Sequence, residues 1–142
     1  MIEIREASIN DSESISNLLE QLDYSGTNRF INKRVKELIE HKDETLLVAK
    51  KDEKVVAVLS LHFIPQLALE GDFCRISYFC VDEDNRSDGV GALLESYAVK
   101  LAKEKKCDRI EVHCNQRRRK AHKFYYKQGY IESPKYLIKS LV

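Results

Sequence analysis

A short segment in the middle of the chain carries the residue types of a phosphate-binding loop: Arg86, Ser87, Asp88, Gly89, Val90, Gly91 and Ala92. Its glycines leave no side chain between the backbone and a ligand. An apolar repeat follows at once and predicts a helix, whose first N–H groups lack partners within the helix. Phosphate oxygens bind at such a positively polarised helix start. The loop therefore predicts a phosphate site, the alternative being a glycine-bearing turn before a surface helix.

The residues around this loop narrow the kind of phosphate site. The β-branched and aromatic run 76–81 precedes the loop and predicts a strand, and the acidic run 82–85 predicts a turn. No Gly-Lys-Ser/Thr follows the glycines, so the segment is not a kinase-type P-loop. The third glycine of a dinucleotide-binding fingerprint is also missing. The order is strand, acidic turn, glycine loop and helix.

A second block, residues 121–130, reads Ala-His-Lys-Phe-Tyr-Tyr-Lys-Gln-Gly-Tyr. With the glycine loop it resembles the GCN5-related N-acetyltransferase (GNAT) superfamily. In that superfamily an Arg/Gln-x-x-Gly-x-Gly/Ala loop binds the pyrophosphate of acetyl-CoA, and an Ala-x-x-Phe-Tyr-x-x-x-Gly-Phe/Tyr block follows. The resemblance is specific over residues 73–130. It implies an N-acetyltransferase that passes the acetyl group of its cosubstrate acetyl-CoA to a primary amine of a small molecule, by direct attack in a ternary complex.

The resemblance assigns coenzyme contacts to several parts of the chain. The strand end at Phe79, Cys80 and Val81 would hold the pantetheine arm and the thioester carbonyl through its backbone. Arg86 would open the pyrophosphate loop, with backbone N–H groups of residues 88–92 as donors; its alternative is a solvated turn residue. Asp88 looks unfavourable beside two phosphates, and we expect it to cap the helix with its side chain turned away.

The second half of the chain departs from the commonest family pattern. Asn115 follows a predicted strand, where relatives place an asparagine on the pantetheine, but the commonest pattern puts that asparagine where this chain has Arg118. Arg118 would then contact the coenzyme phosphates. Phe124 is the remaining coenzyme-binding residue that the resemblance implies.

The resemblance assigns the general acid to one residue and leaves the general base open. Tyr125 resembles the family's tyrosine general acid, which protonates the departing thiolate; its alternative is a core aromatic beside Phe124. The strand before the loop offers Arg75, Ser77 and Tyr78 where many relatives have a glutamate base. A water-relayed base and a chain that has lost activity are also open. The candidates for the base are Glu70, Asp72, Asp82, Glu111 and His113.

Two rival functions follow from the same residues. A non-catalytic acyl-CoA-binding module that regulates a partner would keep the coenzyme loop without a base. Nucleic-acid binding through the basic run 117–120 is disfavoured, because no aromatic residues interleave with it and the net charge is only +1. We expect the acceptor to bind between the first two helices and the loop 65–72, near Glu20, Asp23 and Tyr24.

Composition places the chain among globular proteins of one domain, residues 1–142, with 43% hydrophobic residues. No apolar run approaches a membrane span and the first residues do not resemble a signal peptide, so we expect a cytoplasmic protein without membrane contact.

The four cysteines show no metal-site spacing, and we expect reduced thiols and no metal. Cys74 and Cys80 would share one face of a strand. An apolar C-terminus, 136–142, leads us to expect a homodimer.

Periodicity predicts a mixed α/β fold. Strands are expected over 2–7, 45–51, 55–63, 73–81 and 108–113, with a terminal hairpin formed by 130–132 and 136–141. Helices are expected from about Asn10, where Asn10 and Glu13 resemble a capping box, and over 31–41, 90–106 and from 121 to a stop at Gly129. The resemblance implies an acyl-CoA N-acyltransferase fold, with a mostly antiparallel twisted sheet of six to seven strands and about four helices.

Overall fold

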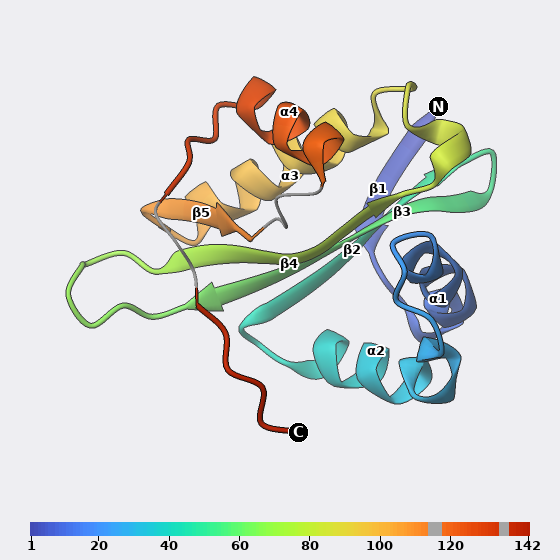
Figure 1. Cartoon of the computed structure of the whole chain (residues 1–142), viewed down its shortest axis with the longest axis horizontal. Coiled ribbons are helices and arrows are strands. Elements are labelled where there is room, and N and C mark those ends of the chain that lie inside the picture. The colour runs from blue at the N-terminus through green and yellow to red at the C-terminus, as the bar shows by residue number, and fades with distance from the viewer. Residues whose placement is uncertain (114–117, 134–136) are drawn as a thin grey trace. The chain divides into compact units, whose positions relative to one another are not determined.

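The structure, a computed structural model, describes residues 1–113, 118–133 and 137–142. The described elements in chain order are β1 (Ile2–Glu6), α1 (Ser12–Glu20), α2 (Ile31–Glu40), β2 (Glu44–Lys51), β3 (Lys54–Ile64), β4 (Phe73–Val81), α3 (Val90–Glu104), β5 (Arg109–Val112) and α4 (Arg119–Lys127), with three short 3-10 turns (Figure 1). The chain divides into two compact units, residues 1–111 and 112–142. Each unit is described by itself.

The first unit is built on a sheet with strand order β1-β2-β3-β4-β5. The pairs β1–β2, β2–β3 and β3–β4 are antiparallel, as expected. The short β5 begins beside the start of β4, where the Asp108 N–H donates to the Asp72 carbonyl at 2.9 Å. β5 has four residues against nine in β4, so the last part of β4 extends beyond it.

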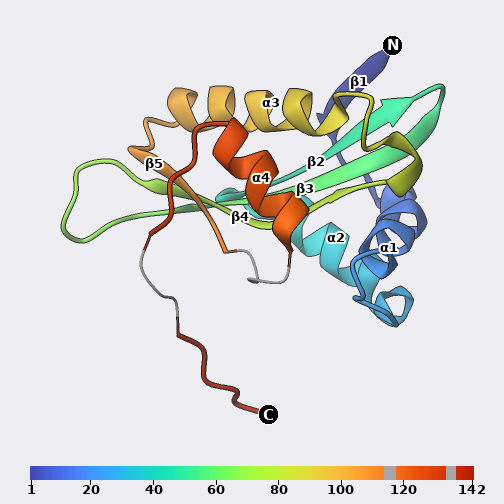
Figure 2. The ribbon, with the colours of Figure 1, turned by 45° about the horizontal axis from the view of Figure 1, so that its top comes forward.

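Helices cover both faces of this sheet (Figures 1 and 2). α1 and α2 lie on one face, where Ile15, Leu18 and Val35 pack with Val48 and Val58 of the strands. α3 lies on the other face and contacts β3 and β4. β3 is buried almost along its whole length, which explains why its sequence is nearly continuously apolar rather than alternating. No helix among the described residues is long and apolar enough to cross a bilayer.

β4 carries a bulge that changes which way its side chains face. Tyr78 pairs with Ser60 and Ile76 pairs with Leu61, so Ser77 is an extra residue. As a result Cys80 pairs with Val58 and Cys74 with Phe63, which stand five residues apart on β3 and face opposite ways. The expectation that the two cysteines share a face is therefore wrong. Cys74, Cys80 and Cys107 are free thiols, as expected.

The first helix begins differently from the predicted capping box. Asp11, not Glu13, closes the turn, because its carboxylate accepts the Ser8 N–H at 2.8 Å. The same carboxylate accepts two hydrogen bonds from Arg5, at 2.7 and 2.9 Å. These bonds from Arg5 hold the pKa of the buried Asp11 below its usual range, against the opposing effect of burial. The pair ties the start of α1 to β1.

In the second unit α4 ends as predicted, with Gly129 in the left-handed region at φ 95°. The predicted terminal hairpin is wrong where the structure describes it: residues 130–133 and 137–142 form no strand, while 134–136 lie outside the described residues. Ile131, Leu137 and Ile138 are more than four-fifths exposed, so the apolar pattern reflects no buried sheet face. The described sheet accordingly has five strands instead of six to seven, while the four helices match the expectation.

Candidate active site

The glycine loop forms an open start to α3. Gly89 occupies the N-cap position at φ 78°, ψ 8°, a left-handed conformation that favours glycine. A Cβ atom at Gly89 would meet nothing within 4 Å, so conformation, and not crowding within the chain, accounts for the glycine. No described side chain caps this helix, which leaves its positive end open to an anion. Gly91 and Ala92 lie in the first turn of α3.

Asp88 does not cap the helix, because the N-cap residue is Gly89. Its carboxylate accepts a hydrogen bond from Lys51 Nζ, at 2.5 Å, at the end of β2. This bond raises the pKa of Lys51, which stays cationic. The expectation that Asp88 caps α3 is therefore wrong, and its carboxylate is instead paired with the charge of Lys51.

Arg86 joins the loop to the strand that precedes it. Its Nε donates to the Val81 carbonyl at 3.1 Å, and the side chain is otherwise exposed. Arg86 is therefore more than a solvated turn residue, since it fixes the exit of β4. Ser87 is exposed beside it, and Val90, the first residue of α3, is fully buried.

The strand end lies beside this loop. Phe79 and Val81 are half-buried, and Cys80 is buried in the cluster under α1 and α2. β5 accompanies only the first part of β4, where Arg75 reaches Glu111 at 2.9 Å. The predicted pantetheine-binding residues 79–81 thus lie on the part of β4 that extends beyond β5.

Two carboxylates considered as general bases are occupied by structural roles. Asp82 is buried, its carboxylate accepts the Asp84 N–H at 3.2 Å, and its own N–H donates to Val56 at 2.8 Å. Glu111 pairs with both Arg75, at 2.9 Å, and Arg109, at 3.7 Å. The Glu111 carboxylate is thus engaged by two guanidinium groups.

The other three candidate bases lie in different parts of the chain. Glu70 is exposed in the loop after β3, and Asp72 stands half-buried just before β4, where its carbonyl accepts the Asp108 N–H. His113 is exposed in the second unit.

The segment between α1 and α2 reaches the bulge of β4. Tyr24 packs edge-on against Tyr78, with ring centroids 5.2 Å apart and planes at 78°. Burial raises the pKa of Tyr78, with further contributions from Tyr24 and Cys80. Tyr24, one of the residues expected to line the acceptor pocket, therefore contacts β4 at its bulge.

A group of three polar residues on the same face was missed by sequence reasoning. His62 of β3 lies between Glu44 of β2 and Ser77 of β4: its Nε2 is 2.5 Å from the Ser77 Oγ, and its Nδ1 contacts the Glu44 carboxylate. Only the pairing of three strands brings these residues together. The one available signal was His62 within an apolar run, where a polar residue needs a partner.

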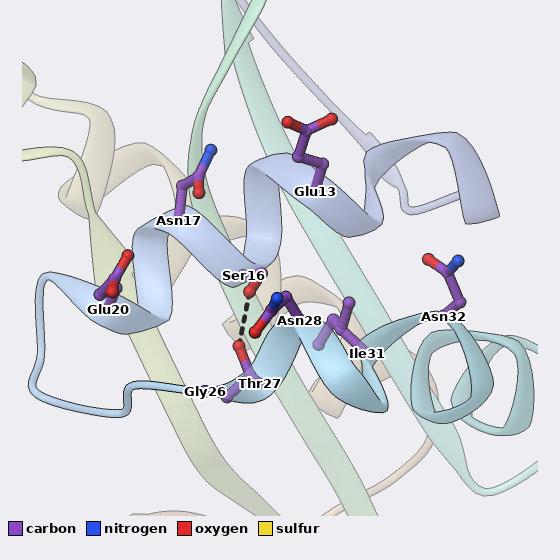
Figure 3. Close-up of a pocket in the computed structure, with 9 residues that line it drawn as sticks. All are labelled: Glu13, Ser16, Asn17, Glu20, Gly26, Thr27, Asn28, Ile31 and Asn32. Carbon is purple, nitrogen blue, oxygen red and sulfur yellow. Dashed lines mark hydrogen bonds between the residues drawn. The ribbon is translucent and has the colours of Figure 1, made fainter.

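A separate hollow of about 500 Å³ lies between α1 and the start of α2 (Figure 3). Glu13, Asn17 and Glu20 line it from α1, and Ser16 shares a hydrogen bond of 2.6 Å with Thr27 at its floor. These residues alternate along α1 with Ile15 and Leu18, which pack on the sheet. The hollow therefore opens on the side of α1 away from the sheet, and it is distinct from the bulge.

The second unit holds the remaining predicted residues. Tyr125 is buried and packs edge-on against Phe124 and Tyr130, with centroids 5.3 Å apart in both pairs. The packing fits the core alternative for Tyr125 and leaves the role of its hydroxyl a prediction. Arg118 is exposed at the N-cap of α4. Asn115 lies outside the described residues.

Comparison with known proteins identifies the family. The model of the acetyltransferase (GNAT) family matches residues 12–130. The chain therefore belongs to the GNAT acetyltransferase family. Among 426 similar solved chains is a transcriptional regulator from Bacillus halodurans, 26% identical with a TM-score of 0.90, with 99% of this chain and 100% of that chain covered.

Two other solved structures share the fold at lower identity. Glucosamine-6-phosphate N-acetyltransferase from Arabidopsis thaliana is 21% identical with a TM-score of 0.87, covering 100% of this chain and 99% of that one. An aminoglycoside acetyltransferase from an uncultured soil metagenomic sample is 18% identical with a TM-score of 0.80, covering 99% and 97%. At these identities the likeness shows the fold alone.

Proposed function

We propose that this protein is an acetyl-CoA-dependent N-acetyltransferase that acetylates a primary amine of a small molecule. The observation that carries the proposal is the uncapped start of α3 at Gly89, with the nearby Asp88 charge paired to Lys51. An open helix start binds pyrophosphate through backbone donors and needs no metal. Family membership makes acetyl-CoA the expected anion.

In the proposed complex the pyrophosphate lies against the backbone of residues 88–92. The Arg86 guanidinium stands beside it, held by its bond to the Val81 carbonyl. The pantetheine arm follows the end of β4 past Phe79–Val81, which sets the thioester near the bulge. Arg118, Asn115 and Phe124 complete the coenzyme contacts in this proposal.

The acceptor amine attacks the thioester directly in a ternary complex. Its nitrogen bonds to the carbonyl carbon, the carbon–sulfur bond breaks, and the thiolate leaves with the electron pair. We assign protonation of that thiolate to the Tyr125 hydroxyl. The amine enters from the side of β4 where Tyr24 contacts Tyr78.

Release of coenzyme A thiol over a panel of amines tests this function. The panel holds glucosamine 6-phosphate and an aminoglycoside, which the names of two relatives suggest, with spermidine and a free-amine peptide. We expect thiol release above hydrolysis for at least one small amine. Binding of acetyl-CoA without acetylation of any amine would contradict the enzymatic assignment.

A second candidate function is a non-catalytic acyl-CoA-binding module that regulates a partner. It is favoured by the transcriptional regulator with which this chain shares 26% identity. Such a module would bind acetyl-CoA as tightly as the enzyme and show no thiol release with any amine. The same assay therefore separates the two functions.

A further inference from the structure

The three residues Glu44, His62 and Ser77 are arranged as a proton relay on the α1–α2 side of the sheet. His62 Nε2 lies 2.5 Å from Ser77 Oγ, and Nδ1 contacts the Glu44 carboxylate. Each residue comes from a different strand, so the rigid pairing of β2, β3 and β4 sets the geometry. A base held between a hydroxyl and an orienting carboxylate is the arrangement that makes a histidine an effective proton acceptor.

The bulge gives this relay its position. Ser77 is the extra residue of β4, and its neighbour Tyr78 contacts Tyr24. Ser77 is exposed, whereas the side chains of His62 and Glu44 are only 25% and 19% exposed. The hydroxyl is thus the accessible end of the relay, two residues before the predicted pantetheine-binding segment 79–81. No carboxylate of β4 is needed at that place.

The surroundings fit a base with one defined partner on each side. Glu44 Oε2 is buried and accepts no hydrogen bond among the described residues, and the contact that reaches it is that of His62 Nδ1. Arg75 of β4 stands opposite His62 of β3, and Arg75 pairs with Glu111.

We propose that His62 is the general base of the acetyl transfer, acting through the Ser77 hydroxyl and oriented by Glu44. This inference rests on the proposed N-acetyltransferase function and supplies the base that the sequence lacks on β4. Ser77 and His62 touch the reacting proton, and Glu44 is a positioning residue.

The proton balance of the step is complete. The acceptor ammonium gives one proton to Ser77 Oγ as that hydroxyl passes its own proton to His62 Nε2. The amine nitrogen then bonds to the thioester carbon, the carbon–sulfur bond breaks, and the thiolate takes the electron pair. The Tyr125 hydroxyl protonates the sulfur and regains a proton from the nitrogen, so amide, coenzyme A thiol and protonated His62 result. His62 returns its proton to solvent.

The pH dependence of turnover, measured with the best amine of the panel, tests this base. We expect His62→Gln to lower kcat by about 10²–10⁴-fold, the range for a positioned base, and to abolish the acid limb of the kcat profile. The affinity for acetyl-CoA, measured by calorimetry, should stay within about twofold, because the relay stands apart from the phosphate loop. His41→Gln is the matched control: His41 is exposed and its Nδ1 accepts the Asp43 N–H instead of joining the relay.

Glu44→Gln separates positioning from packing. It keeps the shape of the side chain and removes the negative charge beside Nδ1, so kcat should fall while KM and the melting temperature stay near those of the wild type. A purely structural role would instead lower the melting temperature. Ser77→Ala should lower kcat without changing the affinity for acetyl-CoA.

Two results with His62→Gln would overturn the assignment: an acid limb that is unchanged, or a kcat within about threefold of that of the wild type. A mass spectrum that shows acetylated Ser77 would also overturn it, because the serine would then be a nucleophile. Wild-type protein that binds acetyl-CoA but acetylates no amine also overturns it and leaves the coenzyme site standing. Failure of the wild type to bind acetyl-CoA instead removes the proposed function, and this inference with it.

Discussion

At the level of single residues, the loop proposed to bind pyrophosphate has one acidic side chain, which is paired with a lysine. Lys51 Nζ, at the end of β2, donates to the Asp88 carboxylate at 2.5 Å. The sequence does not predict this pair, because Lys51 and Asp88 are 37 residues apart along the chain. The pair explains how an aspartate is tolerated between an arginine and two glycines in a loop proposed to bind pyrophosphate.

The Lys51–Asp88 pair leads to a prediction about removing one of its charges or both. Lys51→Gln should weaken acetyl-CoA binding on the order of threefold to tenfold, because Asp88 then repels the phosphates through solvent-screened interactions. Adding Asp88→Asn should restore most of the lost affinity. Calorimetry at low and high salt measures both effects, which should shrink as salt rises. Lys50→Gln, on the same strand and paired with Glu53 at 3.4 Å, is the control.

Tyr125 leads to a second residue-scale prediction. If its hydroxyl protonates the thiolate, Tyr125→Phe should lower kcat by about 10²–10⁴-fold with little change in acetyl-CoA affinity. Tyr125→Ala should instead cost about 3–5 kcal/mol of folding free energy, because it opens a cavity beneath Phe124 and Tyr130. Thermal melts and turnover of both variants separate chemistry from packing. The exposed Tyr126→Phe is the control, and equal turnover for wild type and Tyr125→Phe would leave only the packing role.

At the scale of elements, the start of α1 leads to a prediction about acid stability. Arg5 holds the pKa of Asp11 below its usual range, so the charged pair adds stability above the ordinary aspartate range and loses it as pH falls. Asp11→Asn should cost about 1–3 kcal/mol at neutral pH, because buried hydrogen bonds are lost. It should also flatten the acid side of the stability profile. Urea melts from pH 3 to 7 measure this, with the exposed Glu3→Gln as control.

The elements also show how far sequence reasoning reaches. Helices with a clear apolar stripe, such as α3, were predicted within two residues, as was the glycine that ends α4. The bulge at Ser77 was not, because one extra residue leaves the composition of a strand unchanged while it reverses every side chain beyond it.

The candidate site divides in the same way. The loop 86–92 is contiguous, so its glycines and its helix are visible in the sequence. The relay of Glu44, His62 and Ser77 exists only through the register of three strands. The terminal hairpin failed for the opposite reason: apolar residues at 137–141 satisfy the pattern of a strand without a described sheet to bury them.

At the scale of the whole molecule, the exposed apolar end of the chain leads to a prediction about assembly. Leu137, Ile138 and Leu141 are each at least 83% exposed. Because exposed large apolar groups favour association, we propose a homodimer that pairs through this end. Sedimentation at tens of micromolar should show dimers, and Leu137→Asp with Ile138→Asp should give monomers. Monomers of the wild type at that concentration would remove the proposal.

Thermal melting of the folded chain with acetyl-CoA shows whether the loop at Gly89 binds the coenzyme. At a hundredfold excess over the dissociation constant, acetyl-CoA should stabilise the wild type by about 2.7 kcal/mol. Gly89→Glu should lose this gain, because a side chain and a charge then fill the open helix start. Gly129→Glu is the control, since Gly129 has a similar positive φ and open space around it. A wild type whose melting temperature does not respond to acetyl-CoA would contradict coenzyme binding at this loop.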